Sequence, residues 1–185
     1  VFDLPPEAAL YMFDADARLI QGPFTRNDRN EEGEFWSPIV IGDTAILELS
    51  VPTTVAGNTA LMIDRVNHGY REFWKTDPAK SGACNVDVIC PDGDDWRDEI
   101  RSVAVYTLNG TWTCSGTLVE NLRHDNTPYF LTANHCNVTS ANAGTMVVYW
   151  NFERPACGSG TGSLSQNQSG AIFRSTRSGS DFCLV

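Results

Sequence analysis

The sequence has 185 residues and a mass of 20.3 kDa, and its 42% hydrophobic and 19% charged residues describe a folded globular protein and exclude general disorder. Its 13 basic and 23 acidic residues give a formal net charge of −10, which is the wrong sign for attraction to nucleic acid or to an anionic membrane surface. No window approaches 18 consecutive apolar residues, so we expect no membrane span.

The composition changes near residue 80. Residues 1–80 contain 7 basic and 13 acidic side chains and no cysteine, whereas all six cysteines follow residue 80. Both lysines of the chain, Lys75 and Lys80, lie in a polar stretch with proline and glycine, as is typical of an exposed linker. We therefore expect a β-rich domain over 1–76, a linker over 77–83 and a second domain over 84–185.

Short apolar runs separated by turn residues predict β structure throughout the first part. The expected strands are Ala9–Phe13, Arg18–Ile20, Ile39–Ile41, Ala45–Val51 and Leu61–Ile63. Such short strands without helical periodicity favour a small β-sandwich.

The second part opens with an acidic stretch, Pro91–Asp95, which we interpret as a solvated loop because it lacks the regular ligand alternation of a calcium loop. Alternating residues over Val103–Leu108 then lead into Asn109-Gly110. This dipeptide favours a type I′ turn, so Thr111–Val119 is expected to return as the partner strand.

Further strands are expected over Tyr129–Thr132, Met146–Asn151 and Ala171–Phe173. The stretch Cys157–Gly170 is rich in glycine, serine, asparagine and glutamine, and predicts a long surface loop.

Six cysteines in the second part indicate disulfide bonds and an oxidising compartment. They are Cys84, Cys90, Cys114, Cys136, Cys157 and Cys183. The alternative is a structural zinc site, but no Cys-x-x-Cys pair occurs and the three histidines are scattered. We therefore expect no metal.

His135 has the most informative surroundings of the three histidines. A predicted strand ends at Thr132, and Cys136, the next residue after the histidine, could anchor it. A general base must be held within hydrogen-bond reach of its proton, which such an arrangement would achieve. Taken alone, a histidine beside a cysteine is more often structural than catalytic.

Three segments together resemble the signature of trypsin-like serine peptidases: Cys114–Val119, Leu131–Cys136 and Ser180–Leu184. Within that family, Ser81–Pro91 and Val147–Asn151 look like the bacterial lysyl endopeptidase branch. The resemblance covers roughly residues 81–185.

The resemblance implies an all-β chain, in which a β-sandwich-like pro-region precedes the N-terminal β-barrel of a double-barrel trypsin-like fold. It makes His135 the general base and Asp181 the acid that orients its ring. The family's Gly-Asp-Ser-Gly-Gly nucleophile segment does not occur in these 185 residues. We therefore expect a truncated chain, inactive alone, whose missing C-terminal half of the catalytic domain supplies the nucleophile. We also expect its last strand, cut at Val185, to leave an exposed edge.

The resemblance also implies a Cys114–Cys136 disulfide and, as a second pair, Cys90–Cys157. Cys84 would bridge to the absent half and stay unpaired here, while Cys183, which departs from the family pattern, is either free and buried or bridged to Cys84. No cofactor is implied.

Lys80-Ser81 would be the maturation site of a zymogen secreted by a bacterium. A catalytic half without lysine would resist self-digestion if the full enzyme cut after lysine, although an arginine-biased composition leaves few lysines anyway. The function expected is a secreted serine endopeptidase precursor acting on protein or peptide substrates after lysine or other basic residues. The alternative is an inactive secreted β-rich binding or adhesion module on a degenerate peptidase scaffold.

Overall fold

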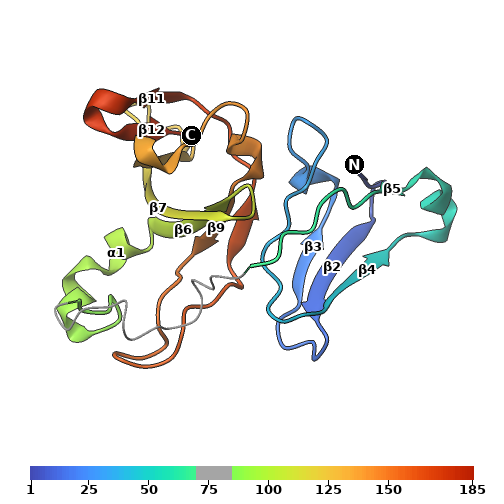
Figure 1. Ribbon diagram of the computed structural model, residues 1–185, viewed down its shortest axis with the longest axis horizontal. Coiled ribbons are helices and arrows are strands. Elements are labelled where there is room, and N and C mark those ends of the chain that lie inside the picture. The colour runs from blue at the N-terminus through green and yellow to red at the C-terminus, as the bar shows by residue number, and fades with distance from the viewer. Residues whose placement is uncertain (70–84) are drawn as a thin grey trace.

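The computed structural model describes residues 1–69 and 85–185, which form a mostly β structure in two parts (Figure 1). The expected all-β class is confirmed. Lys75, Lys80, Ser81 and Cys84 lie outside the described residues, so the linker, the maturation site and the pairing of Cys84 stay predictions. No helix among the described residues is long and apolar enough to cross a membrane.

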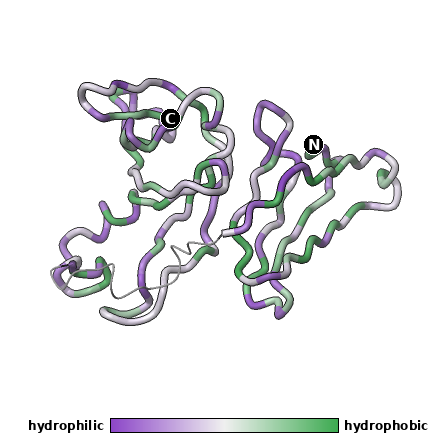
Figure 2. The backbone as a smooth tube through the Cα atoms, viewed as in Figure 1, coloured by the Kyte–Doolittle hydropathy of each residue, from purple (hydrophilic) through white to green (hydrophobic). Residues whose placement is uncertain are grey.

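The first part contains two small antiparallel sheets. Their strands are β1 (Phe2–Asp3) with β5 (Ala60–Leu61), and β3 (Gln21–Phe24), β2 (Ala9–Asp14) and β4 (Ala45–Ser50) in the order β3-β2-β4. Short 3-10 turns occupy Arg26–Asp28 and Thr53–Asn58. In Figure 2, β2 and β4 are mainly hydrophobic, whereas the loop after β3 is hydrophilic.

Alternation along β2 builds the core of this part. Leu10 and Met12 are buried on one face and pack with Phe2 of β1 and Phe24 of β3. Side chains on alternate positions of a strand point to the same face, so one face of β2 meets β1 across a shared core. This arrangement matches the predicted sandwich-like packing.

Two strands predicted in the first part are wrong. Arg18 does not enter a strand, because its guanidinium binds the buried carboxylate of Asp14 at 2.8 Å and the return strand begins only at Gln21. Residues 39–41 form no strand either. The backbone groups of Ile39 bond to side chains instead, the N–H to the Tyr149 hydroxyl at 2.9 Å and the carbonyl to the Gln21 amide at 2.6 Å.

Seven antiparallel strands form the sheet of the second part, in the order β10-β9-β6-β7-β8-β12-β11. Their bounds are β6 (Val103–Leu108), β7 (Trp112–Val119), β8 (Tyr129–Ala133), β9 (Val147–Trp150), β10 (Asn167–Ser169), β11 (Ser175–Arg177) and β12 (Phe182–Leu184). A 3-10 turn over Pro91–Trp96 and helix α1 (Arg97–Ile100) precede them.

The β6–β7 hairpin forms at the predicted dipeptide. Asn109 and Gly110 have φ angles of 53° and 66°, and Leu108 pairs with Trp112 across the loop. Positive φ at two successive residues is what the Asn-Gly turn supplies, because both tolerate the left-handed region. The turn sets the register that places Cys114 opposite Tyr106.

The strand predicted over Ala171–Phe173 is wrong, since pairing resumes only at Ser175. The last strand does not end in an exposed edge either. β12 lies between β8 and β11, and Val185 is 7% exposed and exchanges two backbone hydrogen bonds with Phe130, at 2.9 and 3.0 Å. Its side chain belongs to the core that Tyr106, Phe130 and Met146 build.

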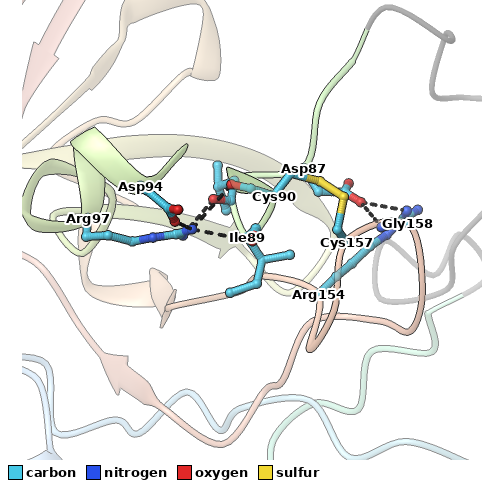
Figure 3. The surroundings of a disulfide bond; sticks show 9 residues. Asp87, Ile89, Cys90, Asp94, Arg97, Arg154, Cys157 and Gly158 are labelled. Atoms are coloured by element: carbon cyan, nitrogen blue, oxygen red, sulfur yellow. Dashed lines mark hydrogen bonds and ion pairs between the residues drawn. A yellow bond between two sulfur atoms is a disulfide. The ribbon is translucent and has the colours of Figure 1, made fainter. Parts of the chain in front are cut away.

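The segment before the 3-10 turn is fastened at three places (Figure 3). Cys90 forms a disulfide with Cys157, and Asp87 Oδ2 accepts hydrogen bonds from Arg154 at 3.0 Å and from the Gly158 backbone at 2.9 Å. Arg97 donates to the carbonyl oxygens of residues 88, 89 and 90 and to Asp94. The acidic stretch is thus an exposed 3-10 turn, and Arg97 of α1 binds it through Asp94.

Candidate active site

His135 and Asp181 come together because their strands pair. β8 ends at Ala133, and the 3-10 turn Asn134–Cys136 carries His135. Asp181 stands directly before β12, whose Phe182 lies opposite Ala133. Since antiparallel partners place the end of one strand beside the start of the other, the two turns meet at the same edge.

Asp181 holds His135 at two atoms. Its Oδ1 accepts the His135 backbone N–H at 2.9 Å, and its Oδ2 accepts the ring Nδ1–H at 2.7 Å. Asp181 itself has a left-handed φ of 49°, and its carbonyl accepts the backbone N–H of Asn134 at 3.1 Å. Asp tolerates this conformation better than most residues, and it turns the carboxylate back toward the histidine turn.

The electrostatics of the pair follow from this geometry. Hydrogen bonds from the His135 ring and backbone hold the pKa of Asp181 below its ordinary value, so the carboxyl is ionised at neutral pH. An ionised carboxylate only accepts hydrogen bonds, so Nδ1 carries the ring proton and Nε2 is the basic nitrogen. The side chains are 72% and 52% exposed, so Nε2 of His135 is available to a reactant.

Cys136 fixes the other side of the histidine turn. Its disulfide with Cys114 ties the turn to β7, with 6.2 Å between the two Cα atoms. Behind it, the Thr132 hydroxyl donates to the Ser115 carbonyl at 2.9 Å and lies 2.9 Å from the buried Tyr106 hydroxyl. The two disulfides pair the cysteines as the resemblance implies.

Asn134 and Thr176 form a link that sequence reasoning missed. The Asn134 amide donates to the Thr176 hydroxyl at 2.7 Å, and this hydroxyl donates to the Phe182 carbonyl at 2.9 Å. The link joins the residue before His135 to the residue after Asp181. The two polar side chains are 42 positions apart, and no spacing in the sequence indicates that they meet.

Cys183 lies two residues beyond Asp181 and is a free, fully buried cysteine. Its thiol points to the Val138 carbonyl, with 3.8 Å between the sulfur and the oxygen, and burial raises the pKa of the thiol. A buried thiol of raised pKa behaves as a small core side chain. Of the two states expected for Cys183, the structure has the free, buried one.

Only one group of side chains among the described residues brings three possible ligand atoms close enough for a metal ion: Cys114, His135 and Cys136. The two sulfurs of this group are bonded to each other. A zinc ligand is a thiolate, so the oxidised pair offers no zinc site.

Several serine side chains in the described ranges form hydrogen bonds away from His135. Ser163 and Ser165 lie 2.8 Å apart at their hydroxyls, and Ser169 donates to the Trp36 carbonyl at 2.6 Å. No hydrogen bond within residues 1–69 and 85–185 joins a serine hydroxyl to His135.

Comparison with known proteins places the second part in a family. The family model for the C-terminal domain of lysyl endopeptidase matches residues 78–185. A curated lysyl endopeptidase of Pseudomonas aeruginosa is 25% identical over 181 residues, covering 89% of this chain and 38% of the relative. The chain thus spans well under half the length of the curated relative that it matches.

Proposed function

The chain belongs to the lysyl endopeptidase family, and on that premise we propose that His135 and Asp181 are the base and the acid of a serine endopeptidase active site. The observation that carries the proposal is the two-atom grip of Asp181 on His135, at 2.9 and 2.7 Å. It fixes the ring with Nε2 free to act as a base, as nucleophilic catalysis by serine requires.

In the proposed reaction, the oxygen of a serine hydroxyl attacks the peptide carbonyl carbon, and Nε2 of His135 takes the proton of that hydroxyl. The ring then carries a positive charge, which the Asp181 carboxylate stabilises through Nδ1–H. The same proton passes from Nε2 to the leaving amine. The serine and the donors that stabilise the oxyanion are proposed to lie in the portion of the full protein that this chain does not span.

The gene provides the first test. We expect the reading frame after codon 185 to encode a Gly-Asp-Ser-Gly-Gly segment. A stop codon instead would favour the alternative of an inactive binding or adhesion module.

A serine-reactive fluorophosphonate provides the second test. It should label the complete gene product, and replacing His135 by Ala should abolish the labelling. The 185-residue chain should remain unlabelled. Labelling of that chain that depended on His135 would contradict the absence of a nucleophile from it.

Cleavage after lysine is the proposed specificity. Two observations support it: the relative is named a lysyl endopeptidase, and the only lysines of the chain are Lys75 and Lys80. The domains are proposed to be 1–76 and 84–185, with maturation of a secreted zymogen at Lys80-Ser81. Replacing Lys80 by Ala in the full-length protein should block processing there, and unchanged processing before Ser81 would contradict it.

A further inference from the structure

A disulfide lies beside the histidine of the candidate active site. The Sγ atoms of Cys114 and Cys136 and a ring nitrogen of His135 all lie within 4.8 Å of one another. In the ranges 1–69 and 85–185, no other three side chains bring possible metal ligands together in this way. What these three atoms can bind depends on whether the two sulfurs are bonded to each other.

Reduction turns the group into a set of metal ligands. The thiolate of a dithiol reductant attacks one sulfur of the disulfide, and its second thiol then closes a cyclic disulfide and releases both cysteines. The reductant loses two electrons and two protons, which end on Cys114 and Cys136 as two thiols. A divalent metal ion that binds them displaces these two protons into solution, because the ligand is the thiolate.

The spacing of the three atoms suits a zinc ion. Zinc binds thiolate sulfur at about 2.3 Å and imidazole nitrogen at about 2.1 Å in a tetrahedral arrangement, so its ligand atoms lie roughly 3.6–3.8 Å apart. Each sulfur is already within 4.8 Å of the His135 nitrogen, so each has to approach it by at most about 1.2 Å. Reduction frees the two sulfurs to separate, and rotation of the cysteine side chains supplies such movements.

The fold keeps the ligands side by side without the bond between the sulfurs. β7, which carries Cys114, pairs with β8, and the turn that carries His135 and Cys136 follows β8 directly. Asp181 holds that turn through the backbone nitrogen of His135, at 2.9 Å. These backbone contacts do not depend on the oxidation state of a cysteine, so the three side chains remain neighbours after reduction.

Solvent reaches the group and can complete it. The His135 side chain is 72% exposed, and both cysteines are only partly buried. A metal ion therefore has an entry path, and water can fill the fourth position. Two thiolates and one imidazole with an open position are a donor set that zinc accepts in proteins.

From this geometry we propose that Cys114 and Cys136, once reduced, form a zinc site with His135, and that the bound zinc blocks His135 as a base. A neutral imidazole has one nitrogen with a free lone pair. The metal takes that lone pair whichever nitrogen binds, because the other nitrogen then carries the ring proton. None is left to accept the proton of a serine. Zinc binding stands by itself, whereas the loss of activity rests on the proposed function.

The second disulfide supplies a control within the same chain. Reduction of Cys90 and Cys157 also releases two thiols, but no histidine or carboxylate in the part of the chain that the structure describes completes a group of three around them. Alanine at both of these positions should leave the zinc site intact. Alanine at both Cys114 and Cys136 should remove it.

Cobalt(II) is the probe for binding, because thiolate ligands give it an ultraviolet charge-transfer band and tetrahedral geometry gives it strong visible absorption. The reduced 185-residue chain, freed of reductant without oxygen, should show both signals with one cobalt ion per chain, and zinc should erase them. The oxidised chain should show neither signal. Equal signals from the two double-alanine variants would overturn the proposal.

Two histidine variants keep every cysteine and so test the third ligand without removing a disulfide. His135→Ala should weaken zinc binding by the reduced chain at least about tenfold, since even the loss of an outer partner of a ligand costs that much. His124, which is 71% exposed on the loop between β7 and β8, is the matched control. His124→Ala should leave the affinity within about twofold. The same affinity in both variants would contradict the assignment of His135 as a ligand.

The complete gene product tests the effect on catalysis. After reduction, saturating zinc should lower hydrolysis of a lysyl ester at least about 100-fold, the contribution of a general base, and a chelator should restore it. The oxidised protein should keep its activity in the same zinc. Full activity of the reduced protein with zinc bound would contradict the block of His135. A gene product inactive in every state would instead contradict the proposed function, and zinc binding by the reduced chain would be unaffected.

Discussion

The carboxylate of Asp181 binds both the backbone and the ring of His135, so the position and the tautomer of the histidine are set by one side chain. A bond to the ring alone would let the 3-10 turn that carries His135 shift. The second bond, at 2.9 Å to the backbone nitrogen, holds the turn itself. The orientation of the imidazole ring is thus fixed by the chain's own contacts.

Replacing Asp181 by Asn should distinguish its effect on the orientation of the His135 ring from the effect of its negative charge. The amide can still contact the ring, but it removes the negative charge that stabilises Nδ1–H and an imidazolium. In the full-length protein we expect kcat to fall by roughly 10⁴-fold. Steady-state hydrolysis of a lysyl ester measures it, with circular dichroism as the control for folding. An activity close to that of the unchanged protein would remove Asp181 from the mechanism.

The hydrogen-bonded link between Asn134 and Thr176 should help to position His135 for catalysis. Thr176→Val keeps the branched shape but loses the hydroxyl, whereas Thr176→Ser keeps the hydroxyl. We expect Thr176→Val to lower kcat about fivefold, the effect of about 1 kcal/mol of lost positioning. The Nδ1–H proton resonance of His135 should shift in the same variant. Thr176→Ser should restore both readouts. A purely structural role would change only the unfolding free energy.

Low pH should weaken the hydrogen bonds between Asp181 and His135. The pKa of Asp181 in the folded chain lies below its ordinary value, so its bonds to His135 stabilise the fold above the unfolded-state pKa. That contribution is lost as the pH falls through the lowered folded pKa, below about pH 4. Urea unfolding should show Asp181→Asn less stable than the unchanged chain at pH 6, with the difference shrinking steadily as the pH is lowered below about 4. A constant difference would contradict this linkage.

The two disulfides should differ in their contribution to stability. They close loops with sequence separations of 67 and 22 residues. Chain entropy predicts a loss of about 4 kcal/mol when Cys90 and Cys157 are both replaced by Ala, against about 3 kcal/mol for Cys114 and Cys136. Denaturant unfolding of the two double variants measures this order. The reverse order would show that native-state packing, not loop length, decides.

Gly116 allows β8 to approach β7 closely. A Cβ there would lie 2.5 Å from the Phe130 ring and 2.6 Å from the Leu131 carbonyl oxygen. Gly116→Ala should therefore cost about 1–3 kcal/mol, the usual range for overpacking. Gly57→Ala is the matched control, because no atom lies within 4 Å of a Cβ at that position. Equal unfolding free energies for the two variants would contradict this steric account.

The sequence predicts best where local rules agree with the fold. A short apolar run predicted β2, alternation predicted β6 and Asn109-Gly110 predicted the hairpin, because these signals act over a few neighbouring residues. The run over 39–41 reads as a strand but lies in the contact between the two parts, where the hydroxyl of Tyr149, 110 positions away, takes the backbone N–H of Ile39. Local patterns do not contain such partners.

In the candidate site, too, local sequence patterns predicted some residues and missed those that depend on distant partners. Family motifs indicated His135, Asp181 and the cysteine pairs, because each stands in a recognisable short segment. Asn134 and Thr176 belong to no such pattern. Their contact follows from the register of β8, β12 and β11, which only the folded sheet reveals.

The attachments on residues 87–90 also set a limit on movement. If the chain is cut after Lys80, the new terminus at Ser81 is connected to Asp87 by about six residues. An extended chain spans at most about 3.5 Å per residue, so the new amino group can reach no farther than about 20 Å from Asp87. Asp87 stays in place through Arg154 and Gly158. Any partner of that amino group must therefore lie within this radius.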